Sequence, residues 1–245
     1  MMGGVSFTEG EQMSRKNVLA VLMVVMMIVG AGSVAAQSVG GGVSVWLPES
    51  SYLVDEGSLG VETALGTSFS MGDLLSLPLG VVINPVYALM PEIDGTVGDS
   101  PWFYADTIST FLMAQLRLPV GPIYFDAFGG VAGFWNATLR PLVKNIEQDI
   151  AAADHIYTFE GAPTITDGRF GWGWQAGGGI GVRIDQISVD LNVTYRLMRA
   201  DATIGGTYAD VDTAGPTATL GNDYEQAMKI RLGGFSIGIN GSFAM

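Results

Sequence analysis

The sequence predicts an all-β fold, a closed antiparallel up-and-down β-barrel of about eight strands. Three observations lead to this prediction. Segments in which apolar and polar residues alternate recur along the chain after residue 37. The links between these segments are alternately short and long. Charged residues make up only 14% of the chain, against roughly 25% in an ordinary soluble domain.

The clearest alternation lies in residues 187–198 and 170–184. In the first segment, aliphatic residues such as Leu191 occupy odd positions and polar residues such as Asn192 occupy even positions. In the second, large residues such as Trp172 oppose a row of glycines. A helix cannot sort residues with a period of two, and its interior is destabilised by so many glycines. Both segments are therefore predicted as strands.

The other strands follow from the same pattern, in chain order. The eight predicted strands cover residues 41–47, 58–69, 77–89, 108–118, 123–136, 170–184, 187–198 and 225–245. Short links lie near Gly72, at 119–122 and at 185–186, and long links at 48–57, 91–106, 137–169 and 201–224. The spacing of Leu142, Val143, Ile146 and Ile150 predicts one or two helical turns in the longest link.

The last strand contains a change of phase. Its apolar residues move from even to odd positions at Gly233-Gly234. A β-bulge explains such a one-residue slip. A Gly-Gly hairpin is the alternative and would give nine strands. The bulge is favoured, because an even number of strands lets the first and last strands pair antiparallel.

The N-terminus has the three-part layout of a secretory signal peptide. Arg15 and Lys16 precede an unbroken apolar run, residues 18–29, and the small residues 34–36 follow it. We therefore expect residues 1–36 to be removed on export, with Met13 as a possible true start, and residues 37–245 to form the barrel domain. An uncleaved anchor helix is the alternative.

The composition of the two faces indicates a transmembrane barrel. A soluble barrel would point its apolar face inward and cover its outer face with Lys and Glu. Here the polar face carries mainly Gly, Ser, Ala, Asn and Gln. Small polar residues suit a narrow interior, and aliphatic and aromatic residues suit lipid. Four aromatics near the long-link ends are expected to form an interfacial girdle, with ordinary core packing as the alternative: Trp135, Phe170, Trp172 and Trp174.

On this pattern, residues 37–245 resemble the small eight-stranded outer-membrane β-barrel proteins of the OmpA/OmpX/OmpW-like class. The resemblance implies a bacterial outer-membrane location, lipid neighbours and a monomer. Members of this class usually end in an aromatic residue that the barrel-assembly machinery recognises. Phe243 has this role by resemblance, although Ala244 and Met245 follow it.

Charged residues on the predicted inward face form a hypothetical charge network in the lumen. They are Glu62, Arg117, Asp126, Arg183, Asp190, Arg196, Lys229 and Arg231. Charges in so narrow an interior must pair with one another or stay hydrated. A salt-bridged plug is favoured over a gate or selectivity filter, because eight strands enclose little more than their own side chains.

Several function classes are disfavoured by composition. The chain has no cysteine and one histidine, His155, so thiolate and multi-histidine metal sites are excluded. A net charge of −13 argues against a nucleic-acid partner. His155 lies beside Asp154, but no nucleophile motif accompanies them. The predicted function is a structural or surface-interaction role, with no cofactor and no enzymatic activity. A narrow channel for small solutes is the alternative, and a lipid-modifying enzyme is third.

Overall fold

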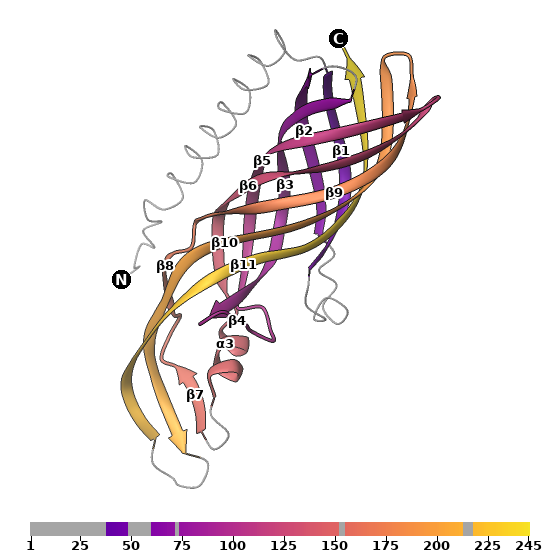
Figure 1. Ribbon diagram of the computed structural model, residues 1–245. Coiled ribbons are helices and arrows are strands. Elements are labelled where there is room, and N and C mark those ends of the chain that lie inside the picture. Colours follow the sequence, from indigo (N-terminus) through magenta and orange to yellow (C-terminus); the bar gives the residue numbers. More distant parts are fainter. Residues whose placement is uncertain (1–37, 49–59, 72–73, 152–154, 213–217) are drawn as a thin grey trace, which may run out of the picture.

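The computed structural model describes residues 38–48, 60–71, 74–151, 155–212 and 218–245, which form one antiparallel sheet and a short helix (Figure 1). The elements are β1 (Ser38–Pro48), β2 (Gly60–Met71), β3 (Leu75–Ile93), β4 (Thr96–Val97), β5 (Phe103–Val120), β6 (Ile123–Pro141), α3 (Val143–Ile150), β7 (His155–Phe159), β8 (Thr164–Asp167), β9 (Phe170–Ile184), β10 (Ile187–Asp212) and β11 (Ala218–Ala244). The predicted signal segment, residues 1–36, lies outside the described residues.

Eight of the strands pair in a ring. The order of pairing is β11-β1-β2-β3-β5-β6-β9-β10, and β10 pairs with β11 to complete the circuit. Every pairing in the circuit is antiparallel. The prediction of an all-β antiparallel fold with eight principal strands is therefore confirmed. Ring closure gives each of these strands a neighbour on both sides, so that their backbone groups are satisfied within the sheet.

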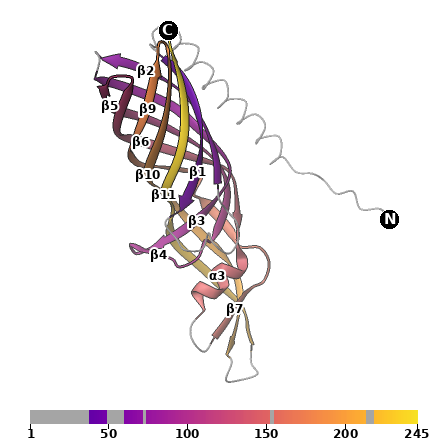
Figure 2. The same cartoon turned by 90° about the vertical axis from the view of Figure 1, so that its right-hand side faces the viewer.

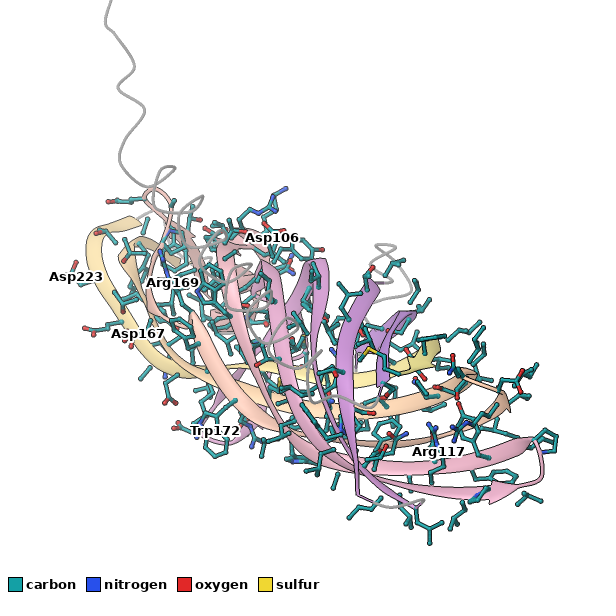
Figure 3. The ribbon with its side chains drawn as sticks, turned by 90° about the horizontal axis from the view of Figure 1, so that it is seen from above. Asp106, Arg117, Asp167, Arg169, Trp172 and Asp223 are labelled. Atoms are coloured by element: carbon teal, nitrogen blue, oxygen red, sulfur yellow. The ribbon has the colours of Figure 1, made fainter. Side chains whose placement is uncertain are left out.

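Two of the three predicted short links form tight turns at one end of the ring, and the third, near Gly72, lies outside the described residues. The link between β5 and β6 turns at Gly121, and the link between β9 and β10 turns at Asp185, both with positive φ. Both turns lie where the sequence predicts them. Arg117, close to one of these turns, lies at one end of the molecule in Figure 3, whereas Asp167, Arg169 and Asp223 lie at the other.

The opposite end differs from the prediction. The sequence predicts a long loop over residues 201–224, but β10 continues to Asp212 and β11 begins at Ala218. From Ala200 to Asp212 this hairpin is roughly 40 Å long, at about 3.3 Å per residue, and it projects past the ring (Figure 1). β7 and β8 pair with β10 along the projecting part. The predicted helical turns are confirmed as α3, and Figure 2 shows α3 and β7 at the end away from the C-terminus.

The change of phase in the last strand is not a bulge, and it is not a turn. β11 pairs with β10 without a register shift through Gly233↔Leu197 and Gly234↔Arg196. The side chains of Met228, Ile230 and Leu232 are buried instead of facing outward. The hydropathy changes because the interior of the ring changes from polar to apolar at this level, while the strand itself continues.

The interior therefore has two parts. At the short-turn end, most inward side chains are polar, although Val82, Phe111 and Phe128 also line this part. At the other end lies an apolar core of buried residues from six strands of the ring, the residue just before β5, β7 and α3: Trp46, Tyr87, Leu89, Trp102, Phe103, Ala105, Ala132, Phe134, Ile146, Phe159, Met198, Ala200, Ala202, Ile204, Met228, Ile230 and Leu232. Beyond the last pairing of β1 with β11, β3 pairs directly with β11 at Pro91↔Ile230. Among the described residues, no helix has the length and apolar character needed to cross a membrane.

Candidate functional site

The polar part of the interior encloses a cavity of about 830 Å³. Residues from all eight strands of the ring line it, and turn residues such as Gly121 and Pro122 form its mouth. The most buried charged residues of its lining are Glu62 and Arg196. We call this cavity the well. It is open at the short-turn end and stops at the apolar core.

A buried ion pair closes the bottom of the well. Arg196 Nη1 and Nη2 donate to Glu62 Oε1 and Oε2, each at 2.8 Å. The Tyr87 hydroxyl donates to Oε1 at 2.5 Å and the Ser44 hydroxyl to Oε2 at 2.9 Å. The Glu62 and Arg196 side chains are only 1% and 3% exposed. A bidentate geometry with two further donors is the arrangement that offsets the large desolvation cost of burying both charges.

A second ion pair lies nearer the mouth. Arg117 donates to the two carboxylate oxygens of Asp126 at 2.9 and 3.0 Å, and Gln115 donates to Oδ2 at 2.8 Å. The Arg117 guanidinium also lies over the Tyr124 ring, 3.9 Å from its centroid. These partners fix the guanidinium on one side of the well, since cation–π contact and bidentate pairing restrict the same side chain.

Asp190 is the third carboxylate of the well. Its Oδ1 accepts hydrogen bonds from the amides of Asn240 at 3.1 Å and Asn192 at 3.4 Å. Its Oδ2 accepts one from the Tyr124 hydroxyl at 3.4 Å. These donors are neutral, so this carboxylate has a different environment from Glu62 and Asp126.

The other end of the interior is closed by α3. Ile146 on this helix is fully buried in the apolar core. Asp149 accepts hydrogen bonds from Trp102 Nε1 and the Ser100 hydroxyl, both at 2.7 Å. Glu147 accepts the backbone N–H of Phe159 at 2.7 Å. The helix is thereby fixed to the segment just before β5 and to the end of β7, and it covers the apolar core at the end away from the well.

The structure places five of the eight predicted lumen charges inside the ring: Glu62, Arg117, Asp126, Asp190 and Arg196. Arg183 lines only the mouth, with an exposed side chain whose Nε donates to the Asp185 carbonyl at 3.2 Å. The expectation that Lys229 and Arg231 face the interior is not met. Without a bulge, odd positions of β11 point outward, so Lys229 is exposed and Arg231 Nη1 lies 3.8 Å from Glu92.

The predicted girdle aromatics lie on the outer face of β6 and β9. Phe170 and Trp172 are 74% and 80% exposed, and Trp174 is 47% exposed. Trp135 is half-buried and stacks on Phe170, with ring centroids 6.3 Å apart. Trp174 continues into a row with Tyr195 and Phe235. Phe170, Trp172 and Trp174 therefore lie outside the apolar core, which was the alternative interpretation.

Sequence reasoning missed Tyr87 and its place in the buried ion pair. The pairing of β3 with β5 is irregular between Asn84 and Tyr87. Before the irregularity, even positions such as Val82 line the well; after it, Tyr87 and Leu89 are buried. Pro85 is the available signal, because proline inside a strand removes a hydrogen-bond donor and commonly marks such a fault.

The remaining predicted residues are His155 and Phe243. His155 begins β7, and its side chain is outside the described part of the structure. Phe243 lies on β11 opposite Val39 and Ile187, with a 49% exposed side chain. An outward position close to the C-terminus is compatible with the assembly role that the resemblance implies, which stays a prediction.

Comparisons with known proteins give little beyond this description. No protein-family model matches the sequence, and no curated protein matches it. Among solved structures, the chain is similar to a major outer membrane protein from Thermus thermophilus. The similarity covers 85% of this chain and 98% of that chain, with 13% sequence identity and a TM-score of 0.42. Similarity at this level carries no assignment, so the functional conclusion rests on the chain's own surfaces.

Proposed function

We propose that this protein is a bacterial outer-membrane β-barrel with a structural or surface-interaction role. The observation that carries the proposal is the inversion of its two faces. Val189, Leu191 and Ile239 are 50%, 50% and 60% exposed, whereas Glu62 and Arg196 are almost fully buried. A water-soluble ring of strands would have the opposite arrangement.

The exposed apolar residues are numerous and continuous around the ring. They include Val43, Val61, Leu65, Leu112, Leu116, Phe125, Val131, Ile180, Val182, Val193 and Ile237. Soluble monomers rarely expose a contiguous apolar patch of more than a few hundred Å². A bilayer covers such a belt, and a closed ring of strands meets its requirement that no backbone group be left unpaired.

The two ends of the ring support an orientation. Barrels of this kind have short turns on the periplasmic side and longer segments outside. The turns at Gly121 and Asp185 would then face the periplasm, and the hairpin of β10 and β11, with β7, β8 and α3, would face outward. This projecting part is the surface that we propose for interaction.

The alternative is a narrow channel for small solutes. The well supports it, since a polar passage enters the ring from the short-turn end. The apolar core and the Glu62–Arg196 pair count against it, because together they fill the interior beyond the well. We favour the structural role on this ground.

The remaining expectations belong to the same proposal. The chain would be exported by its N-terminal signal, with cleavage near Ala36, and assembled through its last strand around Phe243. It would function as a monomer among outer-membrane lipids, without enzymatic activity or a cofactor. Mass spectrometry of the mature protein tests the first point, and an intact N-terminus would contradict it.

Surface labelling tests location and orientation together. The chain has no cysteine, so single cysteines report one position each. Asp223→Cys places a thiol on the projecting hairpin, and Gln186→Cys places one in a short turn. On intact cells with an outer membrane, an impermeant maleimide should label Asp223→Cys only, and both after lysis. Equal labelling of both variants in intact cells, or a folded protein recovered in the soluble fraction, would contradict the proposal.

A further inference from the structure

One carboxylate of the well, Asp190, forms no ion pair within 4 Å among the described residues, although Arg117 lies near enough to act on it electrostatically. Glu62 is paired with Arg196 and Asp126 with Arg117, each by two short hydrogen bonds. Asp190 accepts hydrogen bonds only from neutral groups, and its Oδ2 accepts a single long one of 3.4 Å. Its negative charge is therefore neutralised less than that of the other two.

The two other arginines toward the mouth of the well are already engaged. The Arg117 guanidinium is fixed by Asp126 and by the face of Tyr124. Arg183 lies exposed at the mouth and donates to the Asp185 carbonyl. A charge exposed to water is screened strongly, whereas one inside a narrow well enclosed by protein acts through a lower dielectric constant. Asp190 thus leaves an excess of negative potential inside the well.

We propose that the well binds a small organic ammonium ion whose charged group pairs with Asp190. The well has a volume of about 830 Å³, within the range of small-molecule sites. Its mouth at the short-turn end gives access without any movement of the apolar core. The inference does not depend on the membrane proposal, since the ring forms the well wherever the protein resides.

The chemistry around Asp190 favours an ammonium over a metal ion. An ammonium has three donors and needs separate acceptors, of which Asp190 Oδ2 is one. The Tyr124 hydroxyl donates to this oxygen at 3.4 Å, and the Ser188 side chain also lines the well. A calcium ion requires six or more oxygens in one shell. Among the described residues, no three side chains of His, Cys, Asp or Glu are grouped to hold a metal, and Oδ1 already receives two amide donors.

Saturation-transfer NMR with ethylammonium chloride tests the proposal on the mature protein in neutral detergent at low ionic strength. So small a probe should bind the wild type saturably, with a Kd of about 1 mM or weaker. Asp190→Asn should weaken binding by at least about tenfold, because a partly desolvated charge loses its partner. Asp106→Asn is the matched control: this carboxylate pairs with Arg140 outside the well, and binding should not change.

Two further measurements, with ethanol and with calcium chloride, test the role of the charge and the preference for an ammonium ion. Ethanol has the same shape as ethylammonium without the charge, so it should show no saturable binding to the wild type, a result that needs no variant to fold. Calcium chloride should not compete with ethylammonium beyond what sodium chloride does at equal ionic strength. Undiminished binding to Asp190→Asn, equal binding of ethanol, or specific displacement by calcium would each overturn the inference, and none would bear on membrane location.

Discussion

Breaking the ion pair at the bottom of the well is expected to destabilise the ring strongly. In Arg196→Met, the Glu62 carboxylate keeps only the Tyr87 and Ser44 hydroxyls as partners. Removing one partner of a buried pair typically costs about 3–5 kcal/mol. Both residues line the well, which is open at one end, so we expect a cost near the lower limit, about 3 kcal/mol. Glu62→Gln alone should cost a similar amount by leaving the Arg196 charge unpaired.

The double variant separates pairing from packing. With both charges removed, no isolated charge remains, and the free energy of unfolding should return to within about 1 kcal/mol of the wild type. Urea unfolding in detergent micelles, followed by tryptophan fluorescence and gel mobility, gives these values. Arg140–Asp106 is the control pair, at 3.5 Å with side chains 64% and 37% exposed, and its disruption should cost less than about 1 kcal/mol. Equal costs at the two pairs, or additive costs in the double variant, would refute this reasoning.

Three other predictions concern the outer face, strand contact and conduction. Leu191→Arg should cost roughly 2–4 kcal/mol in lipid vesicles, whereas Asn192→Ser should cost far less; similar costs would mean that the faces are reversed. Gly173→Ala should destabilise the ring by about 1–3 kcal/mol, because its Cβ would lie 1.9 Å from the Leu197 carbonyl oxygen. Gly133→Ala, whose nearest contact is 3.5 Å, should be tolerated in the same urea titration. In planar bilayers, the wild type should show no steady conductance, because the apolar core fills the ring; steady openings would favour the channel.

The strands of the ring could be predicted because successive side chains of a strand point to opposite faces, so that alternating hydropathy shows which face each residue occupies. Leu191 and Asn192 differ in hydropathy and lie on opposite sides of one strand, as the structure confirms. This inference needs no knowledge of distant contacts. The turns at Gly121 and Asp185 were likewise predictable, since they join adjacent strands with residues that adopt positive φ readily.

The far end was not predictable from alternation, because apolar residues face inward there. Met228 and Ile230 match the lipid-facing pattern in composition, so a bulge was needed to place them outside. The structure places them inside, in the same buried cluster as Phe134 and Ile146. Which face of the strand is apolar depends on what fills the ring at that level. Here α3 and β7, which come from the link between β6 and β9, contribute Ile146 and Phe159 to the apolar core. The same error misplaced Lys229.

The apolar core links the ring to the projecting hairpin. Leu232 and Met198 lie within the ring, and Ile204 and Phe159 lie on the projecting part, yet all four belong to one buried cluster. A hairpin that stood alone in water would be marginally stable at best. Here its inner face is buried together with residues of β7, α3 and the other strands of the ring. The hairpin therefore cannot detach from the ring without exposing the apolar side chains that fill the ring. This continuity favours rigid display of the hairpin over opening of the interior, since a passage through the ring would require removing the core that holds the hairpin in place.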